Sequence, residues 1–142
     1  MTTPTPTTTT TTPISDETFR SLTAAAPEIR PFWEGVRRGR LLLAHCTACN
    51  RPHWFPRIVC PLCGSRDIEW REASGQGTVY SVSVARRATP PYALAYVTLD
   101  EGPTMLTNIV DCDLDAVAIG QKVKVVFKDR PDALPAPMFT PL

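Results

Sequence analysis

The chain has 142 residues, of which 43% are hydrophobic and 20% are charged, and its net charge is +1. These values are typical of one soluble domain or two very small ones, and they exclude the strongly basic balance of a dedicated nucleic-acid-binding protein. No apolar run approaches the ~20 residues that cross a bilayer, and the first residues lack the basic and apolar regions of a secretory signal. We therefore expect no membrane segment and a cytoplasmic location, where thiols stay reduced.

The first segment, MTTPTPTTTTTTP, consists almost entirely of threonine and proline. Such a segment has little apolar surface to bury, so burial cannot offset the entropy that ordering would cost. We therefore expect a disordered arm over residues 1–13.

The next segment, residues 14–40, has the features of two short helices. Asp16 can cap a helix over ETFRSLTAAA, which Pro27 ends. Pro31 fits the first turn of a second helix, PFWEGVRRG, and Gly39 lies just beyond its last turn. The sequence therefore predicts a helical N-terminal segment.

Four of the five cysteines lie in CTACNRPHWFPRIVCPLCG as two CxxC pairs. The pairs are Cys46 with Cys49 and Cys60 with Cys63. Two intervening residues let one tight turn present both sulfurs to the same ion, and Asn50 and Gly64, which follow the pairs, tolerate left-handed backbone geometry. A structural zinc site takes four such thiolates in a tetrahedron. With the expected strands RLLLAHC and DIEWREA on either side, the pattern predicts a rubredoxin-like zinc ribbon over residues 41–72.

Two other uses of these cysteines stay open. A CxxC pair also marks thioredoxin-like dithiols, but those carry one pair beside a βαβ pattern that this chain lacks. Four cysteines also bind iron in rubredoxin-type electron carriers. Zinc is favoured because four thiolates match a closed structural site, which leaves no position for an activated water.

No catalytic constellation is visible in the sequence. GxSxG, HExxH, a phosphate-cradling glycine loop and a GxGxxG after a strand are all missing. Cys112 stands alone, and the two histidines, His45 and His53, lie within the ribbon. Cys112 is interpreted as a small buried hydrophobic residue, with a nucleophile as the alternative. We expect no catalytic residue and no chemistry by this chain alone.

From Gly75 onward the hydrophobic period changes to two, which is typical of strands. The expected strands are GTVYSVSVARR, YALAYVTLD, TMLTNIVDCD and KVKVVFKD, joined by turn-like segments. A fifth strand, from residues 69–74 or from the proline-rich tail LPAPMFTPL, would complete an antiparallel OB-fold barrel over residues 73–142. The predicted fold class is mainly β, with short N-terminal helices, a zinc ribbon and a C-terminal OB-fold barrel.

Several sequence blocks resemble, in order, the zinc-ribbon plus OB-fold acyl-CoA-associated proteins. The blocks are PFWEGVRRGRLLLAHCTAC, FPRIVCPLCGS, GTVYSVSV, EGPTMLTNIVDCD and IGQKVKVVF, and they run from Pro31 to the C-terminus. Members of that family usually accompany a thiolase-like enzyme, including lipid-transfer-protein-type thiolases, sometimes with an enoyl-CoA hydratase. The resemblance implies a non-catalytic accessory subunit in a hetero-oligomer that performs thiolysis, acyl transfer or retro-aldol cleavage on acyl-CoA substrates, including steroid side chains. It also implies zinc ligation by the four ribbon cysteines.

Charge patterning suggests where an acyl-CoA could be contacted. Residues 30–87 carry ten basic side chains, all arginine, against four acidic ones. Arginine suits bidentate contacts to phosphates, which coenzyme A would present, or to acidic groups of a partner. The candidates are Arg57, Arg86 and Arg87, and the alternative is an ordinary solvated surface.

The alternative function is a module that binds single-stranded nucleic acid, because zinc ribbons and OB-folds both serve that purpose. Tyr80, Tyr92 and Tyr96 could act as stacking platforms. However, residues 88–142 carry seven acidic and only four basic side chains, so nucleic acid is the less favoured partner.

Overall fold

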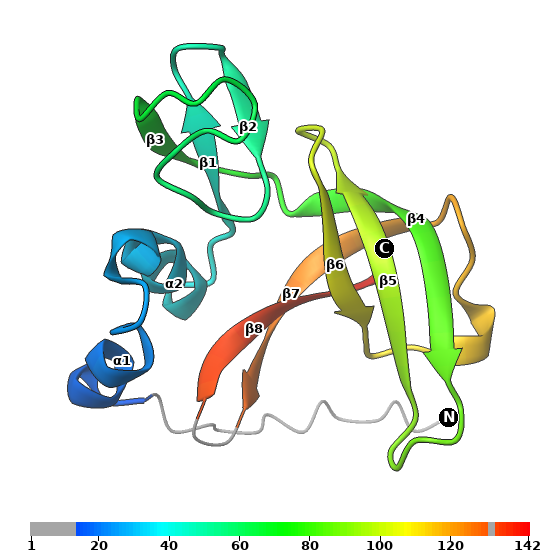
Figure 1. Ribbon diagram of the computed structural model, residues 1–142. Coiled ribbons are helices and arrows are strands. Elements are labelled where there is room, and N and C mark those ends of the chain that lie inside the picture. The colour runs from blue at the N-terminus through cyan, green and yellow to red at the C-terminus, as the bar shows by residue number, and fades with distance from the viewer. Residues whose placement is uncertain (1–13, 131–132) are drawn as a thin grey trace.

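The computed structural model describes residues 14–130 and 133–142, and the predicted arm over residues 1–13 lies outside the described residues. Figure 1 shows three parts: short helices, a small ribbon sheet beside them, and a barrel that forms the other half of the molecule. The fold is mainly β, and the predicted fold class is confirmed. No helix of the described segments has the length and apolar character that a bilayer crossing requires.

The N-terminal helices differ slightly from the prediction. They are α1 (Asp16–Leu22), the 3-10 turn η1 (Pro27–Ile29) and α2 (Arg30–Arg37). The cap of α1 is Ser15 rather than Asp16, because the Ser15 hydroxyl accepts a hydrogen bond from the backbone N–H of Thr18 at 3.2 Å. Asp16 lies in the first turn instead, where its carboxylate complements the positive end of the helix dipole.

The ribbon sheet is antiparallel and has three strands in the order β2-β1-β3. The strands are β1 (Leu42–Cys46), β2 (Arg51–His53) and β3 (Ile68–Glu72). Cys46 at the end of β1 lies opposite Arg51 on one side and Ile68 on the other. The central strand thus delivers the first cysteine into the loops that join the three strands.

The barrel is closed, with the strand order β4-β5-β6-β8-β7. The strands are β4 (Gln76–Ala85), β5 (Tyr92–Leu99), β6 (Thr104–Ile109), β7 (Lys122–Arg130) and β8 (Ala133–Pro141). Of the two candidates for the fifth strand, the proline-rich tail is the correct one, since it forms β8 along β7. Residues 69–74 overlap β3 of the ribbon sheet instead.

A β-bulge divides β4 into two halves with opposite alternation. Its register with β5 shifts between Val79 and Ser81. Val79 is 1% exposed whereas Tyr80 is 68% exposed, and beyond the bulge the inward positions are Val82 and Val84. Because the bulge inserts one residue, Tyr80 stays outward and Val82 and Val84 take the inner positions that Ser81 and Ser83 would otherwise occupy.

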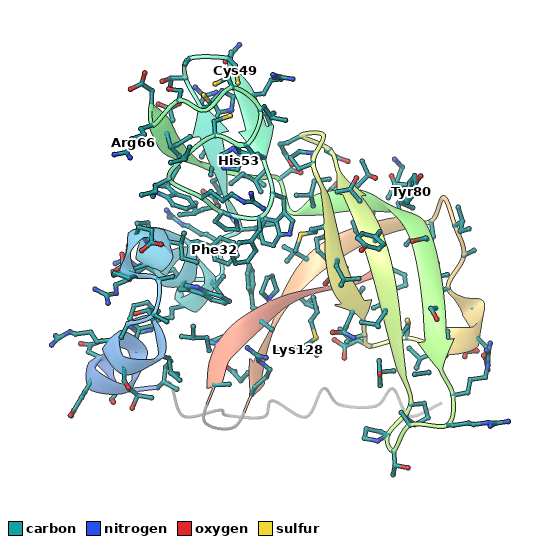
Figure 2. All side chains as sticks on the ribbon, viewed as in Figure 1. Phe32, Cys49, His53, Arg66, Tyr80 and Lys128 are labelled. Carbon is teal, nitrogen blue, oxygen red and sulfur yellow. The ribbon has the colours of Figure 1, made fainter. Side chains whose placement is uncertain are left out.

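One hydrophobic cluster joins the three parts of the molecule. It includes Phe32 and Val36 of α2, Leu43 of β1, and inward residues of the barrel such as Phe139. The Phe32 ring lies 5.0 Å from the ring of Trp33 and 5.4 Å from that of Trp54, centroid to centroid. Figure 2 places Phe32 on α2 at the side that faces the barrel. The helices therefore fill the corner between the ribbon and the barrel.

Candidate metal centre

The four predicted ligands come together at one end of the ribbon. The Sγ atoms of Cys46, Cys49, Cys60 and Cys63 all lie within 4.8 Å of one another. The Cys46–Cys63 and Cys49–Cys60 sulfur pairs are separated by 3.6 Å and 3.8 Å. Four thiolates at about 2.3 Å from a tetrahedral zinc ion lie about 3.8 Å from one another. The donor set therefore fits zinc in type, number and spacing.

The two turns that present the sulfurs depend on left-handed backbone geometry. Asn50 has φ 56° and Gly64 has φ 78°. The Gly64 N–H donates to the carbonyl of Cys60 at 2.8 Å, and the N–H of Leu62 points at the Cys60 sulfur at 3.4 Å. The second turn thus aims the Leu62 N–H at the Cys60 sulfur, and both turns have the left-handed residue that the sequence predicted.

Asn50 contributes a side-chain contact as well as a turn. The His45 Nε2 donates to the Asn50 Oδ1 at 3.0 Å. An Asn50→Gly chain keeps the turn but loses this hydrogen bond, at a cost of about 1 kcal/mol. An Asn50→Ala chain also strains the left-handed turn, which costs about 1–2 kcal/mol more. We expect denaturant unfolding with zinc present to rank the wild type first, Asn50→Gly second and Asn50→Ala last; equal stability of the two variants would contradict this account.

The electrostatics of the thiols indicate that they need a cation. Burial acts to raise the pKa of the Cys60 thiol, but the backbone N–H groups of Leu62 and Cys63 outweigh it and lower the pKa to about 7. For Cys63, the N–H of Ser65 acts to lower the pKa, but the neighbouring thiols, Cys46 first, and burial raise it to about 12. Close thiolates oppose one another's ionisation unless a metal ion neutralises them.

Neither histidine joins the metal centre. Within the described residues, the cluster that could hold a metal contains cysteines alone. His53 is 4% exposed, and no described residue forms a hydrogen bond with either of its ring nitrogens. Burial lowers the pKa of His53, so the ring is neutral at ordinary pH. Figure 2 shows His53 on the side of the ribbon sheet that faces α2, away from Cys49.

The three candidate arginines do not form one cluster. Arg57 lies in the ribbon loop between β2 and β3, where it lines an open cleft of 430 Å³ with Phe55 and Ile58. Arg86 and Arg87 lie at the far end of β4, which Figure 1 shows at the opposite end of the molecule from the ribbon. Arg86 forms an exposed ion pair with Asp115 at 2.8 Å. Their contact with CoA phosphates stays a prediction.

Cys112 lies just after β6, apart from the metal centre. It is partly buried and packs against the hydrophobic core. Burial, and then the carboxylates of Asp113 and Asp111, raise the pKa of its thiol. Both histidines lie in the ribbon, on or beside β1 and β2. These features agree with the interpretation of Cys112 as a packing residue.

The fold and the four-cysteine centre define a zinc ribbon joined to an OB-fold barrel, and known families match both halves. Residues 33–69 match the model of the ChsH2 rubredoxin-like zinc ribbon domain. Residues 70–128 match the model of the ChsH2 C-terminal OB-fold domain. Together with the sulfur geometry, these matches confirm the zinc prediction.

Individual relatives and solved structures agree. A DUF35 domain-containing scaffold protein of Methanothermobacter thermautotrophicus is 35% identical over 68% of this chain and 78% of its own length. A probable enoyl-CoA hydratase alpha subunit of Thermomonospora curvata is 36% identical over 78% of this chain, but this chain spans only 36% of that protein. The structure of an Ltp2-ChsH2(DUF35) aldolase contains a chain that is 34% identical, with a TM-score of 0.70 and coverage of 80% of this chain and 93% of that one. The chain belongs to the DUF35 family.

Proposed function

We propose that this chain is a non-catalytic accessory subunit that binds and supports a thiolase-like enzyme acting on acyl-CoA substrates. The observation that carries the proposal is the match to the DUF35 chain of an aldolase, which extends over 93% of that chain at 34% identity. The name of the Methanothermobacter relative, a scaffold protein, points the same way. The partner's reaction would be thiolysis, acyl transfer or retro-aldol cleavage, including cleavage of steroid side chains.

The metal centre supports an accessory role because its chemistry is structural. Four thiolates complete the coordination shell of zinc, so a bound ion has no free position for water or a substrate carbonyl. The two turns orient the thiolates, and the shared hydrophobic core holds the ribbon against the barrel. Bond making and breaking would then take place on the partner polypeptide.

An enoyl-CoA hydratase is a further proposed partner. The support is the name of the Thermomonospora relative, in which a segment like this chain forms about a third of a hydratase alpha subunit. A hetero-oligomer with a thiolase-like subunit, a hydratase or both would place successive acyl-CoA reactions side by side. A cytoplasmic location is part of this proposal.

The nucleic-acid alternative has less support. The three tyrosines do lie on the barrel surface, with exposed fractions of 68% for Tyr80, 44% for Tyr92 and 47% for Tyr96. However, β4 and β5, which carry them, contain no basic residue. A groove for single strands combines stacking platforms with basic side chains.

Co-expression with a thiolase-like protein of the same organism tests the proposal. We expect the two chains to co-purify, and we expect the partner alone to lose solubility or at least about tenfold in acyl-CoA turnover. The measurement is the yield of soluble partner and its steady-state rate, with and without this chain. A partner that reaches full rate alone would overturn the proposal.

A further inference from the structure

Four adjacent strands of the barrel carry no charge, and one of them is β8, with the sequence ALPAPMFTP. Every residue of β4, β5 and β6 is uncharged. The remaining strand, β7, has the sequence KVKVVFKDR and alternates lysines with its inward residues. An outer barrel surface is normally charged, because outward positions face water.

The outer side of these strands also exposes large apolar side chains. Tyr96 of β5 is 47% exposed and lies directly opposite Leu106 of β6, which is 53% exposed. Leu94 and Tyr92 follow on the same side of β5, with exposed fractions of 40% and 44%, and Tyr80 stands outward at the bulge of β4 (Figure 2). We call these five residues the β5–β6 face. Single exposed apolar side chains are ordinary, but a contiguous group without charges marks a contact surface.

The strand at the border of this face, β6, closes the barrel against β8 at its last residues, and in the part of the chain that the structure describes its first residues have no register partner there. Within the described residues, only Ile109 of β6 has a register partner on β8. The Leu99 N–H donates to the carbonyl of Pro103 at 2.8 Å, so the hydrogen-bonded pairs with β5 fall on Met105, Thr107 and Ile109. By the alternation of an antiparallel ladder, the backbone N–H and C=O groups of Thr104 and Leu106 point away from β5.

Proteins usually protect such an edge with charges, proline or a bulge. Along Thr104–Ile109 the sequence is TMLTNI, which contains none of the protecting residues. Leu106 combines an outward apolar side chain with edge-facing backbone groups. An extended chain laid along β6 would pair with those groups and cover Leu106 and Tyr96 at once.

We infer that β6 accepts an extended, uncharged segment of the thiolase-like partner as an added strand, with its apolar side chains on the β5–β6 face. This inference rests on the proposed function, because that supplies the partner. The chemistry of the occupant follows from the surface: a charged segment would lose hydration against a face that offers no counter-charge. Main-chain pairing provides the register, and alternate apolar side chains provide the contact area.

The binding test compares two matched substitutions of exposed aliphatic residues by glutamate. Leu106→Glu places a charge on the β5–β6 face, and Ile119→Glu places one at a 72% exposed position outside β4, β5 and β6. We expect Leu106→Glu to raise the Kd for the thiolase-like subunit at least about tenfold, and Ile119→Glu to change it by less than about twofold. Tyr96→Glu is a second variant, in case Leu106→Glu alters the edge itself; circular dichroism checks the fold of all three.

Hydrogen exchange of single amides tests the strand pairing. In the free chain, the amides of Thr104 and Leu106 should exchange quickly, whereas those of Met105 and Thr107 should be slow. In the complex, the first two should become protected as well. Protection of Leu106 confirms an added strand, and rapid exchange of Leu106 in the complex would overturn it.

The outcomes separate this inference from the proposed function. If the wild-type chain binds no thiolase-like protein, the proposed function fails. If the wild type binds and Leu106→Glu and Tyr96→Glu bind equally well, only the inference fails. A homodimer of this chain that Leu106→Glu dissociates would also overturn the inference, because the occupant would then be a second copy.

Discussion

A Cys60→Ala chain is expected to lose its zinc and to unfold the ribbon between β1 and β3. Cys60 is 1% exposed, and its sulfur is one of four that lie within 4.8 Å of one another. Structural zinc contributes an apparent binding free energy of about 10–16 kcal/mol in zinc-finger peptides, which is comparable to the whole stability of a small domain, about 5–15 kcal/mol. Metal analysis should fall from about one zinc per chain to near zero, and limited proteolysis should cut the ribbon.

The matched control for this variant is Cys112→Ala. It removes a thiol of the same kind from outside the metal centre, so zinc content should not change. A Cys60→Ala chain that is free of metal but keeps the ribbon resistant to protease would contradict the structural role of the ion. Incubation of the wild type with a chelator should reproduce the Cys60→Ala result, since it removes the ion without changing a side chain.

Phe32→Ala is expected to have the second large effect. The Phe32 side chain is 1% exposed and contacts both Trp33 and Trp54 edge to face. Truncation of a buried phenylalanine leaves a cavity and costs about 3–5 kcal/mol in the free energy of unfolding. Because Trp54 belongs to the ribbon and Phe32 to α2, the loss should also weaken the docking of the ribbon. Urea unfolding followed by tryptophan fluorescence measures it.

Phe55→Ala is the control for the loss of an aromatic ring. Phe55 is 44% exposed, so its truncation should cost about 1 kcal/mol or less. If both variants lose the same free energy of unfolding, the packing of Phe32 between helix, ribbon and barrel contributes no more to stability than an exposed ring does.

The metal centre could be predicted from the sequence because its information is local. Two CxxC pairs, each followed by a residue that tolerates positive φ, specify both turns without knowledge of the rest of the chain. The fold class could be predicted for a similar reason: the period of two in β5 and β7 reports burial on one side. Neither signal depends on distant partners.

Features that depend on contacts between residues far apart in the chain could not be predicted from the sequence. The tail that forms β8 contains prolines, which are unfavourable in most strands, and only its pairing with β7 reveals it as the fifth strand. The bulge at Tyr80 is likewise set by the register with β5, so alternation alone could not tell which side of β4 faces inward. Ser15 was missed as a cap because Asp16 is an equally good capping residue by type.

The arginines illustrate a different limit. Arg57 and Arg86 belong to the same basic stretch of sequence, but one lies in a ribbon loop and the other at the far end of β4. Charge counted along a chain says nothing about distance in the fold. The uncharged β5–β6 face shows the converse, since its signal was present in the sequence as strands without charged residues.

The hydrophobic cluster that includes α2, β1 and the barrel strands has a mechanical consequence. A ribbon attached through a flexible linker would swing freely, whereas a ribbon that shares its interior with the barrel cannot move without exposing that interior to water. The loops at the tip of the ribbon and the hairpin between β4 and β5 are therefore kept at one separation and one angle. Two polypeptides, one bound at the ribbon loops and one at the β4–β5 hairpin, would therefore be held at a fixed distance and orientation.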